Sequence, residues 1–207
     1  TLYIVVGLFI IWQTKDIISF NTFGYHIPTG ASKAVDFLEN NKIAGPIFNN
    51  FDIGSYIAYR LYPKEKVFVD GRPEAYPVSF FQNEYIPIQQ DKMNFAQADK
   101  KYHFNILFIS HTDATPWNQQ FLRNINASSQ WKMVYLDSLV VIYVKNSPQN
   151  QQIKNSIINY TNLSQVNLTK DELTHLLLFY QNIGWSNEIK IIDKKLLQLD
   201  PNSCFAL

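Results

Sequence analysis

The chain has few of the residues that build covalent links or metal centres. Cys204 is its only cysteine, so a disulfide within these 207 residues and a zinc site made of cysteines are both excluded. Glycine occurs only 7 times, and the sequence contains no glycine-rich phosphate-binding loop and no GxSxG, HExxH or CxxC motif. The patterns of common nucleotide-binding, hydrolase and metalloprotease sites are therefore absent, and we expect neither a cofactor nor a metal ion.

Charge of either sign is also scarce. Charged residues make up 17% of the chain, and 18 Lys and Arg nearly balance 17 Asp and Glu, which leaves a net charge of +1. Proteins that bind nucleic acid usually present a basic face, so we expect no nucleic-acid partner. Hydrophobic residues make up 46% of the chain, which is enough for a buried core and argues against disorder.

An apolar run without any charge opens the sequence. Residues 1–12 have the sequence TLYIVVGLFIIW, which is shorter than the roughly 20 apolar residues that a membrane-spanning helix needs. Two interpretations remain: the end of a transmembrane helix that begins upstream, or an apolar helix or strand of a soluble core. Three features favour the membrane helix: the missing initiator Met, the absence of charge, and Trp12 placed before the polar residues 13–16. Trp12 counts because Trp prefers the membrane interface.

Helical and strand-like segments alternate between residues 31 and 145. Apolar spacing predicts helices over residues 31–41, 52–61, 78–90, 96–103 and 115–125, and short buried strands over 47–48, 66–70 and 105–110. Alternation of apolar and polar residues over 131–137 and 139–145 predicts an antiparallel hairpin. Strands separated by helical crossovers are typical of parallel sheets. We therefore expect an α/β fold with a three-layer, mainly parallel sheet and an antiparallel hairpin at its edge.

Composition divides the chain into four parts. These are the end of a transmembrane helix (1–20), the α/β domain (21–146), a linker rich in Asn, Gln and Ser (147–168) and a helical hairpin (169–207). The hairpin has two amphipathic segments joined at Gly184 and ends in LQLDPN, which resembles a tetratricopeptide repeat. One repeat cannot bury its own apolar face, so the hairpin either packs on the α/β domain or begins an array that continues past Leu207.

Polar clusters follow each of the three predicted parallel strands. Because the carboxyl ends of parallel strands meet at one edge, where open α/β sheets bind ligands, we expect the clusters to lie close together. Arg72 is suited to hold a phosphate or carboxylate, and Asp70 or Glu74 to accept a proton or bind a divalent cation. The clusters are Asn49, Asn50 and Asp52, then Asp70, Arg72 and Glu74, then Ser110, His111 and Asp113. Among them, the predicted substrate-binding residues are Asn50, Asp70, Arg72 and Glu74.

The same residues also have a purely structural interpretation. Asp70 and Arg72 can pair with each other or cap a neighbouring helix, around a Gly71 that supplies a positive φ. Asp52 is explained by N-capping the helix that follows it. His111 has no partner at a recognisable spacing, and a lone histidine is more often structural than functional.

Three segments of the sequence resemble a known family. Residues 48–57 (FNNFDIGSYI) and 67–76 (VFVDGRPEAY) resemble the C-terminal soluble region of bacterial polytopic membrane proteins of the GT-C superfamily, the dolichyl-phosphate-mannose mannosyltransferase-like glycosyltransferases. Residues 131–137 (WKMVYLD) are similar to the closing hairpin of that region, so the similarity covers roughly residues 1–145. Asp52 and Ser55 stand where the family's pattern has glycine or aromatic residues.

The resemblance implies a large integral enzyme of the cell membrane that uses a polyprenyl-phosphate-linked sugar, with this domain on the extracytoplasmic side. In that superfamily the catalytic carboxylate lies in an early loop between transmembrane helices, which is not in this chain. The fragment would then be an accessory or acceptor-recognising domain, with the membrane as a partner and the sugar donor bound by the missing membrane part. The alternative is a membrane-anchored interaction module without catalytic activity, whose helical hairpin recruits a protein partner. A soluble small-molecule enzyme is a third and weaker interpretation, because no catalytic constellation is legible.

Overall fold

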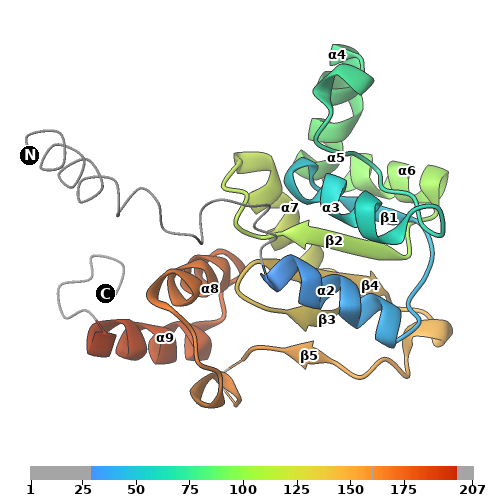
Figure 1. Cartoon of the computed structure of the whole chain (residues 1–207). Helices are drawn as coiled ribbons and strands as arrows, with labels where there is room; N and C mark the ends of the chain where they lie inside the picture. Colours follow the sequence, from blue (N-terminus) through green and yellow to red (C-terminus); the bar gives the residue numbers. More distant parts are fainter. Residues whose placement is uncertain (1–28, 160, 200–207) are drawn as a thin grey trace, which may run out of the picture.

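The computed structural model describes residues 29–159 and 161–199 of the chain. They form a five-stranded sheet with helices on both faces, and a helical arm stands out from one end (Figure 1). Over these residues no helix is both long enough and apolar enough to cross a membrane. The apolar run of residues 1–12, interpreted above as the end of a transmembrane helix, lies outside the described residues.

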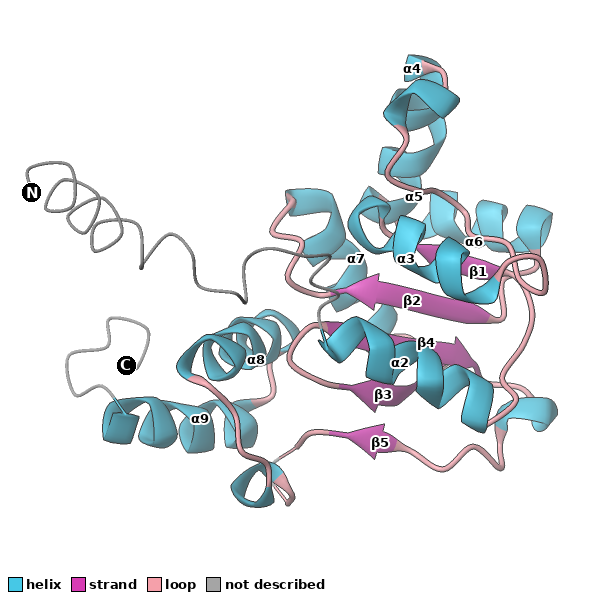
Figure 2. Ribbon diagram, viewed as in Figure 1, coloured by secondary structure: helices cyan, strands magenta, loops and turns pink. Residues whose placement is uncertain are grey.

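The sheet is mixed, with strand order β1-β2-β4-β3-β5 (Figure 2). Strands β1 and β2 pair in parallel, as do β3 and β5, whereas β4 runs antiparallel to both of its neighbours. The expectation of a mainly parallel sheet is therefore not confirmed. The predicted hairpin of β3 and β4 is confirmed, but it lies inside the sheet, because β5 from the predicted linker adds an outer strand. The strands are β1 (Ile47–Asn49), β2 (Ile106–Ser110), β3 (Trp131–Leu136), β4 (Val140–Lys145) and β5 (Ser156–Ile157).

The helices predicted from apolar spacing are present, with ends shifted by a few residues. They are α2 (Thr29–Asn40), α3 (Phe51–Leu61), α4 (Val78–Phe80), α5 (Ile86–Gln90), α6 (Lys92–Tyr102), α7 (Pro116–Asn126), α8 (Lys170–Ile183) and α9 (Ser186–Leu199). A π-helix, η2 (Phe81–Tyr85), joins α4 to α5, and we call residues 78–90 the arm. A short 3₁₀ turn, η1 (Pro73–Ala75), precedes the arm. The N-cap of α3 is Asn50, so the prediction that Asp52 caps this helix is wrong; Asp52 lies in its first turn.

Alternate side chains of β2 enter two separate cores. Ile106 and Phe108 pack with α2 and α3 on one face, whereas Leu107 and Ile109 pack with α5 to α9 on the other. All residues of β2 are buried, as is typical of a strand covered on both faces. The ring of Phe179, on α8, lies 4.8 Å from that of His111, just after β2. The helical hairpin therefore packs on the sheet domain, the first of the two alternatives for it.

Residues 66–70, predicted as the second parallel strand, form no strand. A side chain holds them beside β1 instead: the Phe68 amide donates to Asn49 Oδ1 (2.9 Å), and Asn49 Nδ2 donates to the Val69 carbonyl (2.7 Å). Gly54 of α3 permits this approach, because a Cβ at Gly54 would lie 1.9 Å from the Val69 carbonyl oxygen. The side chain of Asn49 thus takes the place of a main-chain ladder, and the segment crosses the start of α3 as irregular chain.

Candidate functional site

The carboxyl ends of β1 and β2 lie side by side, and two helices lead away from them on opposite faces of the sheet. Helix α3 follows β1 into one core, and α7 follows β2 into the other. A crevice outside the carboxyl ends of parallel strands, where the connections diverge, is the usual ligand position in open α/β sheets. A ligand site is therefore expected at this edge.

Asn50 ties the two strand ends together. It is fully buried; its Oδ1 accepts a hydrogen bond from the Ser110 amide (2.9 Å), and its Nδ2 donates to the Ser110 carbonyl (3.1 Å). The same Nδ2 donates to Oδ2 of Asp113 over 3.3 Å, while Oδ1 of Asp113 accepts from the Thr115 amide (2.9 Å). The first and third polar clusters are thus brought together, as expected, and the Asp113 carboxylate is held at the edge by these two contacts.

A cleft of about 310 Å³ opens at this edge, and we call it the carboxyl-edge cleft. Its walls come from the starts of α3 and α7, from η1 and from the arm. The lining holds two carboxylates and four aromatic rings but no Lys, Arg or His. It consists of Phe51, Asp52, Pro73, Phe81, Tyr85, Ile86, Asp113, Thr115 and Trp117.

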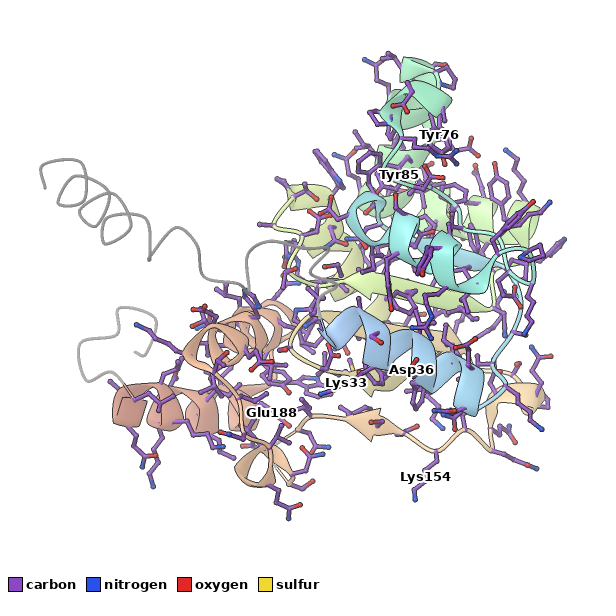
Figure 3. The ribbon with its side chains drawn as sticks, in the orientation of Figure 1. Lys33, Asp36, Tyr76, Tyr85, Lys154 and Glu188 are labelled. Atoms are coloured by element: carbon purple, nitrogen blue, oxygen red, sulfur yellow. The ribbon has the colours of Figure 1, made fainter. Side chains whose placement is uncertain are left out.

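Asp52 is the carboxylate that remains available in this cleft. Burial, and secondly the charge of Asp113, raise the pKa of Asp52 above its ordinary value. Asp52 accepts no hydrogen bond from the residues that the structure describes. Tyr85 lies at the base of the arm (Figure 3). Its hydroxyl accepts a hydrogen bond from the Phe51 amide (2.8 Å), and burial raises the Tyr85 pKa, so this phenol stays protonated. The cleft therefore offers one free acceptor among aromatic side chains, and the Tyr85 hydroxyl fixes the start of α3 beside it.

The second polar cluster is self-contained. Arg72 donates from Nε to Asp70 Oδ1 (3.0 Å) and from Nη2 to Oδ2 (2.6 Å), and this pairing lowers the Asp70 pKa. Asp70 is only 4% exposed, whereas Glu74 is exposed and acts on Arg72 through its charge. Pro73 is the member of this segment that lines the cleft. The predicted binding residues Asp70 and Arg72 thus hold each other, which agrees with their structural interpretation.

Gly71 does not have the positive φ that its position between Asp70 and Arg72 suggested. Among the described glycines, only Gly45 and Gly184 have one. The amide of Gly71 donates to Ser55 Oγ over 2.9 Å, which fixes the segment to α3.

His111 lies away from the cleft, in the core beneath α8. Its Nε2 is 2.9 Å from the Asp137 carbonyl oxygen and therefore carries the proton, while burial lowers the His111 pKa to about 4. The ring is 4% exposed and stays neutral at pH 7. The structural interpretation of this histidine is supported.

The aromatic walls are what the sequence interpretation missed. Trp117, Tyr85 and Phe81 belong to helices whose apolar spacing indicated only core positions. One sequence signal was available for Trp117. The first turn of a helix that follows a parallel strand lies at the carboxyl edge of the sheet, and Trp117 lies in such a turn.

The described residues contain no group of three or more His, Cys, Asp or Glu side chains placed to hold a metal ion. No protein-family model, curated protein or solved structure matches the chain. Its function is therefore inferred from the geometry of the site together with the sequence resemblance.

Proposed function

We propose that the chain is the extracytoplasmic C-terminal domain of a polytopic membrane glycosyltransferase that takes sugar from a polyprenyl-phosphate donor. Within it, the carboxyl-edge cleft binds a sugar. The patterns of residues 48–57 and 67–76 support the class of enzyme. The observation that supports a sugar ligand is the free carboxylate of Asp52 in a cleft that Trp117 and Tyr85 also line.

The chemistry of the lining suits a sugar. A sugar ring carries hydroxyl groups around its rim and C–H groups on its faces. Carboxylates form strong hydrogen bonds with hydroxyl donors, and aromatic rings pack against apolar faces. Pockets for small molecules combine such apolar walls with a few placed polar groups. Asp52 supplies the polar group here, and Trp117 and Phe81 supply the walls.

The same lining disfavours a phosphate. Asp52 and Asp113 are the ionisable acids of the cleft, and no cationic side chain lines it. Two like charges would repel a phosphate monoester or diester instead of binding it. The cleft is therefore proposed for the sugar or the acceptor, with the donor phosphate bound by the membrane part of the enzyme. This division makes the domain accessory to a catalytic carboxylate elsewhere.

The Asp-Gly-Arg segment has a positioning role in this proposal. Asn49 and Gly54 fix the start of the segment beside β1 and α3, and the ion pair between Asp70 and Arg72 joins its two ends. The segment then presents Pro73 to the cleft and leads into the arm, which contributes Phe81 and Tyr85. The Asp-Gly-Arg segment therefore shapes the cleft, and the proposed ligand contacts come from Asp52, Phe81 and Trp117.

The alternative, a membrane-anchored interaction module, needs an apolar surface on the helical hairpin. Most apolar side chains of α8 belong to the core, including Leu173, Leu176 and Phe179. Leu178 and Leu199 remain 50% and 59% exposed. A protein partner on the hairpin stays a proposal that rests on this smaller surface.

Transfer of labelled sugar from a polyprenyl-phosphate donor, in membranes that contain the full-length product of the gene, tests the proposal. Asp52→Asn and Trp117→Ala should each lower kcat/KM about tenfold, the effect of losing one hydrogen bond or one stacking contact. Asp171→Asn is the matched control, because Asp171 also lies in the first turn of a helix but outside the cleft. Equal rates for Asp52→Asn and Asp171→Asn would contradict the site. A reading frame upstream of the Thr1 codon without several apolar spans would contradict the class of enzyme.

A further inference from the structure

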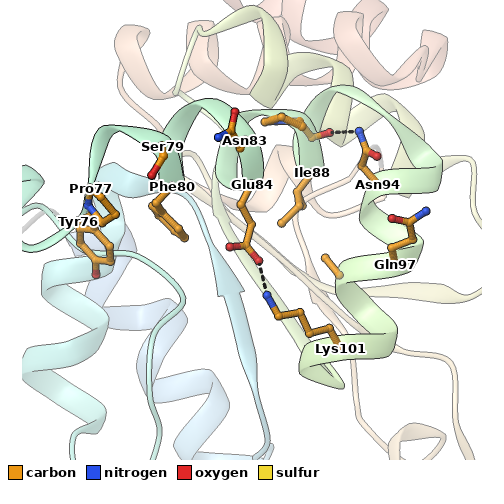
Figure 4. A pocket seen from close by; sticks show the side chains of 12 residues that line it. Tyr76, Pro77, Ser79, Phe80, Asn83, Glu84, Ile88, Asn94, Gln97 and Lys101 are labelled. Atoms are coloured by element: carbon orange, nitrogen blue, oxygen red, sulfur yellow. Dashed lines mark hydrogen bonds and ion pairs between the residues drawn. The ribbon is translucent and has the colours of Figure 1, made fainter.

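A larger cavity, of about 650 Å³, lies between the arm and α6 (Figure 4). We call it the arm cleft. It shares no lining residue with the carboxyl-edge cleft. On the arm, Phe81 and Tyr85 face the carboxyl-edge cleft, whereas Phe80, Asn83 and Glu84 face the arm cleft. The arm therefore separates two clefts of different chemistry.

The lining of the arm cleft mixes polar and apolar groups and carries no net charge. Tyr76 and Phe80 lie at one end, Asn94 and Gln97 lie at the other, and Glu84 reaches across to Lys101 between them (Figure 4). Lys101 Nζ is 2.9 Å from Glu84 Oε1, so the two charges compensate each other. The remaining lining residues are Pro77, Ser79, Asn83, Pro87, Ile88 and Ala98.

Several hydrogen-bonding groups in this cleft are unused. The amides of Asn83 and Gln97 are exposed, and neither forms a hydrogen bond with the described residues. Glu84 accepts from Lys101 and from the Tyr102 hydroxyl (2.5 Å) on the same oxygen, Oε1, which leaves Oε2 without a donor in the described chain. These contacts also fix the Glu84 side chain in place. Glu84 belongs to the π-helix η2, a feature that often marks functional sites.

We propose that the arm cleft binds a neutral oligosaccharide of a few sugar units. Side-chain amides both donate and accept hydrogen bonds, as sugar hydroxyls do, so Asn83 and Gln97 can pair with a hydroxyl in either sense. Tyr76 and Phe80 stack on each other at 5.1 Å and 24° and offer an aromatic surface to the apolar face of a sugar. A volume of this size accommodates a ligand larger than one sugar ring.

The two other classes of extended ligand fit less well. A peptide that binds as an added strand needs the open edge of a sheet, and both walls of this cleft are helical. An anionic polymer needs free cations, but Lys101, the cation in the lining, is already paired with Glu84. A neutral, hydroxyl-rich chain needs neither feature.

This inference does not depend on the proposed transferase function, since the two clefts have separate linings. It is tested on the 207-residue chain, labelled with ¹⁵N and kept in a detergent without a sugar headgroup. Maltotriose, cellotriose and chitotriose are titrated in, and the NH₂ signals of Asn and Gln side chains are followed by NMR. At least one trisaccharide should shift the signals of Asn83 and Gln97, with a dissociation constant of about 1 mM.

Two variants and a control locate the binding. Asn83→Ala and Gln97→Ala should each weaken it about tenfold, the effect of one lost hydrogen bond. Gln82→Ala should leave it unchanged, because Gln82 is an exposed amide of the same arm that does not line the cleft. An equal loss in Gln82→Ala would overturn the proposal, as would silence of Asn83 and Gln97 up to about 20 mM of all three trisaccharides. Triglycine is titrated in the same way, and signal shifts with triglycine alone would assign the cleft to a peptide. Sugar-induced shifts of the Trp117 indole signal alone would place the sugar in the carboxyl-edge cleft only. Either result overturns this inference.

Discussion

The side chain of Asn49 forms the hydrogen bond to Val69 that the main chain of a neighbouring strand would otherwise form. Nδ2 donates to the Val69 carbonyl over 2.7 Å and to the Asn50 carbonyl over 2.9 Å, and Oδ1 accepts from the Phe68 amide over 2.9 Å. Asn49 is fully buried, so these bonds form away from water, where losing one partner leaves another unsatisfied. This amide therefore attaches residues 68 and 69, just before the Asp-Gly-Arg segment, to β1, where the Phe68 ring also contacts that of Phe48.

Asn49→Asp tests this attachment. The change keeps the acceptor for Phe68 but places a carboxylate oxygen against the carbonyls of Val69 and Asn50. We expect the free energy of unfolding to fall by about 3 kcal/mol, measured by urea denaturation. Asn83→Asp, at an exposed position, should change it by less than about 0.5 kcal/mol. Similar urea midpoints for the two variants would show that the Asn49 contacts are dispensable.

Gly54→Ala should be more damaging than Gly71→Ala. A Cβ at Gly54 would lie 1.9 Å from the Val69 carbonyl oxygen and 2.9 Å from the Asp70 Cα, both main-chain atoms that cannot rotate away. A Cβ at Gly71 would meet only the Ser55 side chain, with Oγ at 2.9 Å, and that side chain can turn at the cost of its hydrogen bond from the Gly71 amide. We expect Gly54→Ala to lose about 3 kcal/mol despite the better helix propensity of alanine, and Gly71→Ala to lose less than about 1 kcal/mol. Thermal and urea unfolding of the two variants measure both losses. A smaller loss in Gly54→Ala than in Gly71→Ala would contradict the prediction.

The helices and the β3–β4 hairpin were predictable because their patterns are local. Helix α7 illustrates this, since Thr115 caps it and apolar residues recur along one side. The sheet order was not predictable in the same way. Strand β5 has only two residues and carries no pattern. Residues 66–70 have the continuous apolar run of a short buried strand but bind the side chain of Asn49 instead.

The residues of the site also divide into those that the sequence predicts and those that it does not. Asn50 and Asp113 follow strands, so their meeting at one edge could be inferred from the sequence. The aromatic wall made by Tyr85 could not, because it depends on how the arm folds back over the start of α3. That contact, the hydrogen bond from the Phe51 amide to the Tyr85 hydroxyl, joins positions 34 residues apart.

His111 should make the stability of the fold depend on pH. Burial lowers its pKa from 6.5 to about 4, and the nearby His175 acts in the same direction, so the folded chain takes up this proton at a lower pH than the unfolded chain. Stability is therefore complete above about pH 6.5 and is lost as the pH falls towards 4, by about 3 kcal/mol.

Urea midpoints at several pH values between 7.5 and 4 measure this loss. His111→Gln keeps a donor for the Asp137 carbonyl and removes the titrating ring, so its stability should fall less over this range. His103→Gln, at an exposed histidine, serves as the control and should keep the wild-type slope. A wild-type slope in His111→Gln would assign the pH dependence to other groups.

Asp113→Asn should lower the pKa of Asp52. Burial is the larger cause of the raised Asp52 pKa and remains in the variant, whereas the charge of Asp113 is the second cause and is removed. The pKa of Asp52 should therefore fall but stay above its ordinary value of 3.8. Carboxyl ¹³C shifts followed over pH measure it, with Asp171→Asn as the control.

The same variant connects the titration to the proposed ligand. If a sugar hydroxyl donates to ionised Asp52, binding in the carboxyl-edge cleft should weaken as the pH falls through the pKa of that group. In Asp113→Asn the midpoint of this loss should move to lower pH together with the Asp52 pKa, because the same carboxylate controls both. Binding measured by tryptophan fluorescence, with Trp117→Phe to identify the signal, gives that midpoint. If the Asp52 pKa moves but the midpoint of the binding loss does not, Asp52 is not a ligand contact. Binding in the cleft would then depend on its aromatic side chains alone.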